Sequence, residues 1–307
     1  MLKIFGAFVN RINYTNFFKD NKRILLLLIE NEIIIIDEYI FSKITSTKYV
    51  SMNYLEYFQP EISPFLTTEL INKYKSQNPD LAKKDFIEKI KNQEITDIFY
   101  EKRREGENDN YLCRVIRDNA IDDFIIFETQ SGLPLNSFIK SSIFETNSFL
   151  IENNQTTLIE YAAFCGSLDI FKHIVVNNVK LKTSIWLYAI HGRNAEIIKN
   201  YLEENHIEPP HSDYLTVFNE SIECHHNEIS TYFLDNFINS QNLQYNTDSC
   251  RRILKSHNYF FFPEKVDNKF WFCSLCEFNY IILFKLFIQE ENTYIDSRNV
   301  FNYCCFK

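Results

Sequence analysis

The chain has 307 residues, of which 45% are hydrophobic and 24% charged, which is typical of an ordered protein with a large core and excludes a disordered one. Its 5 glycines and 7 prolines are too few for many tight turns between strands, so long helices joined by short polar turns are favoured. The net charge is −9, and the one short basic cluster, residues 102–104, is surrounded by glutamates. We therefore expect no nucleic-acid partner.

Residues 1–100 are predicted to form an N-terminal helical region. The apolar spacing and the available caps place helices near residues 21–30, 33–45, 65–76 and 80–95. The most apolar stretch, residues 23–41, is interrupted by four acidic residues and falls short of the roughly 18 consecutive apolar residues of a membrane span. We interpret it as two buried helices that meet near Asn31, and we expect no membrane insertion.

Two further segments predict irregular structure. Residues 101–110 contain no apolar side chain and predict a loop that separates the N-terminal region from the rest of the chain. Residues 126–155 contain Gly132 and Pro134 and predict an irregular insertion.

The N-terminus and the cysteines indicate where the protein works. The first residues lack an apolar run as long as that of a signal peptide. The eight cysteines lack the regular spacing of a small secreted disulfide framework. We therefore expect a cytoplasmic protein, with a nuclear one as the alternative.

A sequence pattern that starts at residue 157 occurs again further along. The stretch TLIEYAAFCGSLDIFKHIVVNNV, residues 157–179, combines two adjacent alanines with a lone glycine, Gly166. Placing Gly192 on Gly166 brings Ala189 onto Ala163. The match predicts that the two segments fold alike.

The acidic residue of the pattern recurs at intervals that fit a repeated structural unit. With one inserted residue Glu196 falls on Asp169, and Glu228 follows in a third copy. The steps of 27 and then 32 residues lie within the roughly 20–50 residues that are typical of stacked repeats. Fainter copies occur in residues 111–125 and 270–288.

The residues of one unit predict a helix–turn–helix. The small side chain lies where the neighbouring unit approaches, and glycine allows the chain to reverse. The acidic residue lies near the positive end of the second helix, and an i, i+4 apolar stripe follows it. Asn178 and Asn205 are predicted to end the second helices in the left-handed conformation.

These residues carry a resemblance to a known family. The stretch TLIEYAAFCG followed by DIFKHIVVNNV resembles the ankyrin consensus. Wider stretches, such as SIWLYAIHGRNAEIIKNYLEENHIEP, resemble the ankyrin-like proteins of unknown function that are expanded in trichomonad protists. The resemblance implies an all-α fold, a helical-hairpin solenoid of degenerate ankyrin-like repeats over residues 101–307, clearest over 156–235.

The chain departs from the ankyrin consensus in several places. Leu158 and Ser184 replace the consensus proline, while Glu160 and Trp186 replace the histidine. Glu160 is expected at the surface. The glycines of the hairpins between repeats are missing, so we expect the projecting β-fingers to be reduced or absent.

Two groups of residues could hold chemistry, and we expect neither to do so. Cys273 and Cys276 have zinc-ligand spacing, and His225-His226 would be the residues to complete a set, but no second pair is suitably spaced. Cysteines are usually buried packing residues, so we expect no metal, no stoichiometric zinc and no cofactor.

A nucleophilic site from Cys165, His191 and Asp169 is the other candidate, but nothing in the sequence marks an oxyanion hole. We therefore expect no enzyme.

The repeats predict a non-enzymatic scaffold or adaptor for protein partners. The alternative is an enzyme or metal-dependent module whose site lies in the N-terminal helical region. In ankyrin-like stacks the first helices and the turns form the binding face, and the candidate binding residues there are Trp186, His191, Arg193, His225 and His226. This weakly basic, aromatic group predicts a partner with an acidic and partly apolar surface. A packed Trp186 with merely solvated histidines is the other interpretation.

Overall fold

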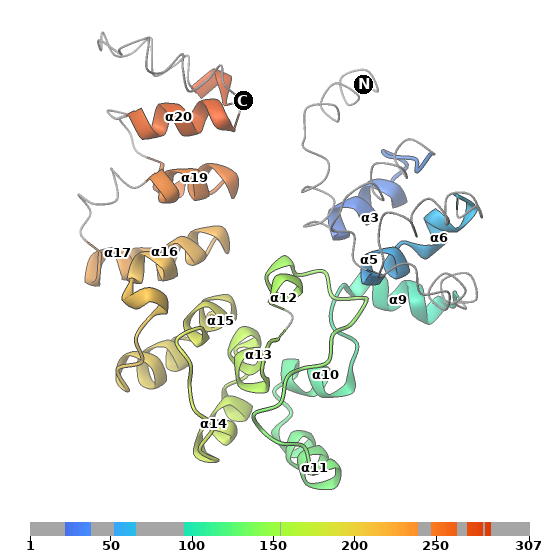
Figure 1. Cartoon of the computed structure of the whole chain (residues 1–307), viewed down its shortest axis with the longest axis vertical. Coiled ribbons are helices and arrows are strands. Elements are labelled where there is room, and N and C mark those ends of the chain that lie inside the picture. Colours follow the sequence, from blue (N-terminus) through green and yellow to red (C-terminus); the bar gives the residue numbers. More distant parts are fainter. Residues whose placement is uncertain are drawn as a thin grey trace, which may run out of the picture. The chain divides into compact units, whose positions relative to one another are not determined.

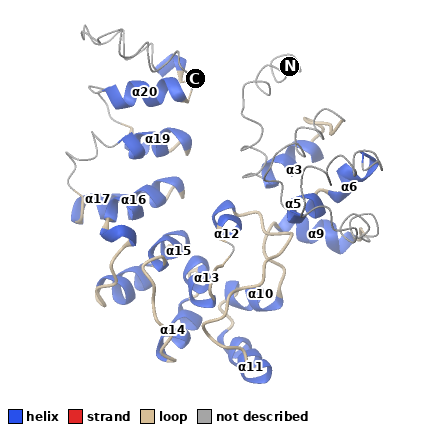
Figure 2. Cartoon of the chain, in the orientation of Figure 1, coloured by secondary structure: helices blue, strands red, loops and turns tan. Residues whose placement is uncertain are grey.

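The computed structural model describes residues 22–37, 52–65, 95–153, 155–238, 247–262, 269–278 and 280–283. Within these ranges the regular elements are helices and there is no strand (Figure 2). The expected all-α class is therefore confirmed for the described residues.

The long helices that the glycine and proline content predicts are not found in the described part of the chain. The described helices are short, with 11 residues in the longest. In chain order, they are α3 (Lys22–Glu30), α5 (Met52–Tyr57), α6 (Gln59–Ile62), η1 (Ser63–Phe65), α9 (Asp97–Glu105), α10 (Tyr111–Arg117), α11 (Ile121–Ser131), α12 (Ser148–Glu152), α13 (Leu158–Cys165), α14 (Leu168–Val176), α15 (Ile185–Gly192), η2 (Ile197–Glu203), η3 (Pro210–Ser212), α16 (Tyr214–Glu223), α17 (Asn227–Asn236), α19 (Thr247–Lys255), η4 (Tyr259–Phe261) and α20 (Lys269–Glu277).

The chain divides into two compact units. The described parts of the first unit lie before Val115 and in residues 138–156, and those of the second lie in residues 115–137 and after Thr156. The division falls inside α10, whereas the sequence placed the boundary at residue 100. Residues 138–156 belong with the N-terminal unit because their backbone carbonyls accept hydrogen bonds from Lys22 and Asn108.

The first unit has a buried ion pair at its centre. Arg103 is 2% exposed and donates two hydrogen bonds of 2.8 Å to the carboxylate of Glu61. The hydroxyl of Tyr57 donates to the backbone carbonyl of Arg103. Arg103 belongs to α9, so the loop predicted for residues 101–110 is wrong in its first half. Within α9 the side chains of Glu101, Arg104 and Glu105 are exposed. That of Arg103 is buried but paired with Glu61, so this charged segment can be helical.

The apolar run near the N-terminus also differs from the prediction. The helix expected over residues 21–30 is present as α3. The described part of the next segment, residues 33–37, is not helical, so the second buried helix is wrong there. Ile33 and Ile35 are 46% and 76% exposed. The helices predicted near residues 65–76 and 80–95 lie, apart from Phe65 and Ile95 at their ends, outside the described residues.

The second unit is built from successive helix pairs. The pairs are α10 with α11, α13 with α14, α15 with η2, and α16 with α17. The helix α19 follows them. The first helices stack in chain order, because α13 packs against α15, α15 against α16, α16 against α19, and α19 against α20 (Figure 1).

The turn inside each pair has the same backbone geometry. A residue with positive φ follows the first helix at Asn119, Gly166, Arg193, His225 and His257. In every case its N–H bonds the carbonyl three residues earlier, and at four of the turns the next N–H bonds the carbonyl five residues before it. These are the two hydrogen bonds of the Schellman motif. We call these five residues, with the residue after each, the turn ladder.

Side chains of the turn ladder connect each turn to the one before it. The hydroxyl of Ser167 donates to the carbonyl of Ile116, and the amide of Asn194 donates to the carbonyl of Gly166 at 3.1 Å. The amide of Asn258 donates to the carbonyl of Ile222 at 3.0 Å. At Ile116 and Ile222 the side chain adds a second hydrogen bond to a carbonyl that already accepts from the left-handed residue of its own turn. The three bonds join successive helix pairs at their turns.

The turn ladder corrects the alignment of the repeats. Arg193, not Gly192, has the left-handed conformation that Gly166 has. Counted from the left-handed residue, the acidic side chain comes three residues later in four of the five turns, with Phe260 at this position after His257, so the inserted residue is unnecessary. The same count pairs Ala189 with Ala162 rather than with Ala163.

The two repeat glycines lie against each other. A Cβ atom on Gly192 would lie 2.0 Å from the carbonyl oxygen of Ala163, and one on Gly166 would lie 2.6 Å from the carbonyl oxygen of Gly192. Gly192 is therefore needed for the close approach of α15 to α13, and only Gly166 serves the turn itself.

Two smaller expectations have opposite outcomes. Asn178 is left-handed with φ 63°, as predicted. The prediction for Asn205 is wrong, because His206 has the positive φ, while the Asn205 amide donates to the carbonyls of Asn200 and Tyr201.

Glu160 is not at the surface, contrary to expectation. It is 5% exposed, and its carboxylate accepts hydrogen bonds from the N–H and hydroxyl of Thr157 in a capping box. It also accepts a hydrogen bond from the hydroxyl of Ser184 at the start of the next pair. A polar side chain here joins two pairs, so Glu160 is structural.

Overpacking at the α13–α15 contact tests this architecture. Ala163 is fully buried, so Ala163→Leu is expected to lower the free energy of unfolding by about 1–3 kcal/mol. The matched control is Ala195→Leu at an exposed position, with an expected change within about 0.5 kcal/mol. Urea denaturation followed by circular dichroism measures both, and equal midpoints for the two variants would contradict the contact.

Candidate functional site

Trp186, the predicted aromatic anchor, is not on a binding face. It is fully buried, its indole N–H donates to the carbonyl of Ile207 at 2.8 Å, and its ring packs edge-on against Tyr214 and Phe233. The prediction is therefore wrong for Trp186. A large aromatic ring fills the space between α15 and the α16–α17 pair, and the N–H is satisfied inside, as buried tryptophan requires.

The other four predicted residues lie on neighbouring turns of the second unit. Arg193 and His225 are exposed, and His191 and His226 are partly exposed. Burial lowers the pKa of His226, and the positive charge of Arg193 lowers it further. The structure thus brings these four residues together and leaves Trp186 out.

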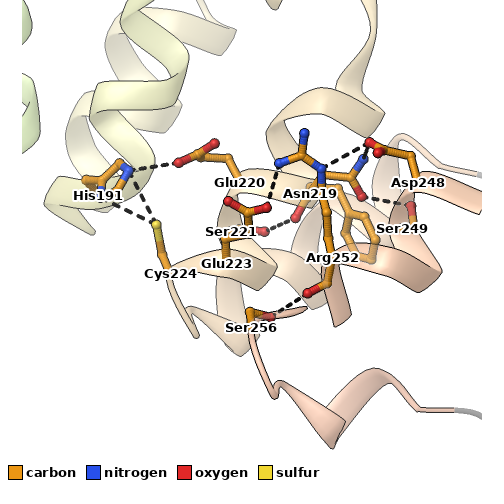
Figure 3. Close-up of polar contacts among 11 residues, drawn as sticks. His191, Asn219, Glu220, Ser221, Glu223, Cys224, Asp248, Ser249, Arg252 and Ser256 are labelled. Carbon is orange, nitrogen blue, oxygen red and sulfur yellow. Dashed lines mark hydrogen bonds and ion pairs between the residues drawn. The ribbon is translucent and has the colours of Figure 1, made fainter. Parts of the chain in front are cut away.

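A polar cluster connects α15 to α16 beside these turns. The Nε2 atom of His191 lies 2.9 Å from a carboxylate oxygen of Glu220. The Sγ atom of Cys224 lies 3.4 Å from Nδ1 and 3.5 Å from Nε2 of the same imidazole. Figure 3 shows the side chains of Glu220, in α16, and of Cys224, directly after it, pointing at His191. The ring of Phe164 stacks on the imidazole at 5.0 Å between centroids and fixes its position.

The interface of α16 with α19 holds a parallel set of ion pairs. Arg252 donates to Glu223 at 2.8 Å and to Asp248 at 3.0 Å (Figure 3). Behind them the buried side chain of Asn219 accepts a hydrogen bond from the hydroxyl of Ser249. The carboxylate of Glu223 is thereby engaged, and Glu220 is engaged by His191.

The surroundings of Cys224 keep its thiol protonated. Burial raises the pKa of Cys224, and the carboxylates of Glu220 and Glu223 raise it further. A nucleophilic cysteine needs the opposite, a thiolate stabilised by nearby positive charge. The sulfur also lies almost equally far from both ring nitrogens, so it does not point along either lone pair. The cluster is therefore unsuited to act as a cysteine–histidine nucleophile.

The cysteine sets considered from the sequence do not assemble as sites. Asp169 is paired with the amide of Asn119, while His191 contacts Cys224 and Glu220 instead. Cys273 and Cys276 are both partly exposed on α20. The grouping of Cys165, His191 and Asp169 is therefore replaced by a different one.

Sequence reasoning missed Glu220 and Cys224. They are four residues apart and so share one face of α16, and this spacing was a usable signal. Their partner His191 was already singled out. The missing step was the register between successive pairs, which the one-residue error at Gly192 obscured.

Comparison with known proteins found that no family model, no curated protein and no solved structure matches this chain. Among the helices that the structure describes, none has both the length and the apolar character needed to cross a membrane.

The reactivity of Cys224 tests the electrostatics of the cluster. At neutral pH, we expect iodoacetamide to label Cys224 in the folded chain much more slowly than in the urea-unfolded chain, because burial and two carboxylates keep the thiol protonated. Peptide mass spectrometry follows the labelling, with Glu223→Gln expected to speed it. Equal rates in the folded and unfolded chains at pH 7 would contradict this description.

Proposed function

We propose that this chain is a non-enzymatic scaffold for protein partners, built as a solenoid of degenerate ankyrin-like repeats, that works in the cytoplasm or the nucleus. The observation that carries the proposal is the turn ladder: five successive turns share one backbone geometry, and the first helices stack in chain order. Stacked units of this kind present an extended surface and hold no chemistry in common.

The exposed members of the turn ladder are the best candidates for partner contacts. Arg193, His225 and His257 are exposed in consecutive turns. Left-handed residues at helix ends contribute their backbone to the turn. The imidazoles of His225 and His257 also contact the carbonyl of Ser256 and the hydroxyls of Tyr259 and Tyr280, yet both residues remain exposed. Loop residues held by a rigid scaffold are where binding residues concentrate.

The charges around these turns favour an acidic partner. Of the neighbouring carboxylates, Glu196 is engaged by Lys172 and Glu223 by Arg252, while Glu228, three residues after His225, is exposed. Arg193 forms no ion pair with any described residue. Its guanidinium is thus an exposed positive charge on a chain of net charge −9, and such a local reversal selects partners by charge complementarity.

Charge reversal on the turns tests the proposal. The full chain is used to capture proteins from lysate, and the double variant Arg193→Glu with His225→Glu is expected to lose most of the main captured partner. Capture by the unchanged chain should weaken as salt rises, because exposed charges are screened. Circular dichroism melting of the double variant should stay unchanged.

The matched control changes charge by the same amount on the second helix. Lys199→Glu with Asn200→Glu alters two exposed residues of η2 and is expected to keep the partner. Full capture by the folded Arg193→Glu, His225→Glu variant would place the binding face elsewhere. Equal loss of the partner in both variants would show that the net charge of the chain, and not these turn residues, determines capture.

A further inference from the structure

Three side chains of different metal-binding types converge between α15 and α16. His191 Nε2, a carboxylate oxygen of Glu220 and the Sγ atom of Cys224 all lie within 4.8 Å of one another. In the part of the chain that the structure describes, they form the one group of three such ligands. This group lies in the helix pairs, not in residues 1–100.

The group occurs at one interface of the stack. Counted from the left-handed residues, the positions of His191, Glu220 and Cys224 hold other residues at the neighbouring interfaces. Between α13 and α15 they hold Phe164, Tyr188 and Gly192, and between α16 and α19 they hold Glu223, Arg252 and Ser256.

At both neighbouring interfaces, a side chain at these positions already has a contact partner in the protein. Phe164 stacks on the His191 ring at the first, and Glu223 pairs with Arg252 at the second. Of these three interfaces, only the one between α15 and α16 adds a thiol to a histidine and a carboxylate.

We propose that His191, Glu220 and Cys224 bind a divalent cation of the zinc class. Zinc takes thiolate, imidazole and carboxylate ligands at about 2.0–2.3 Å in a tetrahedral arrangement, which places ligand atoms roughly 3.3–3.6 Å apart. The distance of 3.5 Å from His191 Nε2 to Cys224 Sγ has the length of such an edge. Because Sγ also lies 3.4 Å from Nδ1, the Cys224 side chain has to rotate toward the Nε2 side of the ring to share an ion with it. The 2.9 Å from Nε2 to Glu220 requires the carboxylate to move back by a few tenths of an ångström.

The charges of the group match a divalent ion. On binding, the Cys224 S–H bond breaks, a sulfur–metal bond forms, and the proton passes to solvent. The resulting thiolate and the Glu220 carboxylate together carry two negative charges, and neutral His191 adds none. Without a cation, the thiolate would face the carboxylates of Glu220 and Glu223, so the metal supplies what the protein environment lacks.

A bound cation would hold α15 against α16 and keep one coordination position open. The side chains of His191 and Glu220 are 16% and 15% exposed, so water can reach the ion as a fourth ligand. This role goes beyond the scaffold proposal and stands independently of it. It replaces the expectation from the sequence that the chain binds no metal.

Cobalt absorption tests the site. Co²⁺ is titrated into the reduced, metal-stripped full chain, and we expect one ion per chain with a thiolate-to-cobalt absorption band, displaced by Zn²⁺. Cys224→Ser should abolish the band. Glu220→Gln, which keeps the size of the side chain, and His191→Gln should each weaken cobalt binding at least tenfold. Losing even a supporting group lowers the metal affinity of a site by about 10–100-fold.

Two controls keep the test specific. Cys165→Ser changes the cysteine one residue before Gly166, the position that Cys224 has before His225, and should leave the titration unchanged. Cys273→Ser with Cys276→Ser should do the same. A band that survives Cys224→Ser, a band lost with Cys273 and Cys276, or no band in the unchanged chain would overturn the proposal.

Discussion

The second unit depends on one backbone constraint, the left-handed residue that reverses the chain between the two helices of a pair. Glycine takes this conformation without strain, but only Gly166 uses it among the five turns. A side chain in the left-handed region costs about 1–2 kcal/mol. The Schellman hydrogen bonds and the ladder bonds from Ser167, Asn194 and Asn258 offset that cost, so the turn persists with arginine or histidine at its tip.

This constraint also decides where function can vary. The buried positions of the pairs are fixed by packing, as at Ala163, which is fully buried, and at Gly192, where even a methyl group has no room. The left-handed position needs only a backbone conformation, so its side chain is open to change. Arg193 and His225 occupy it, and His191 and Cys224 lie one or two residues before it. The candidate binding surface and two of the three candidate metal ligands therefore lie at the left-handed turn residue or directly before it.

The sequence predicted the helix pairs, the small residue at their contact and the left-handed Asn178 because those features have local signals. It misplaced the turn at Gly192 because a glycine can serve a turn or a close approach. Only the neighbouring carbonyl of Ala163 distinguishes the two. Trp186 could be read as an anchor because its burial depends on Ile207 and Phe233, which are remote in sequence. The pairing of Glu220 and Cys224 with His191 likewise depends on how one pair is stacked on the next.

The two proposed roles of this face are physically coupled. A divalent ion at His191, Glu220 and Cys224 would add positive charge one or two residues from Arg193 and His225 and would pin α15 to α16. A partner that selects the positive surface would then bind the metal-loaded chain more tightly. Linkage requires that the partner raise the affinity for the metal by the same factor. The single polar cluster between α15 and α16 would thus set both the rigidity of the stack at this point and the charge that it presents.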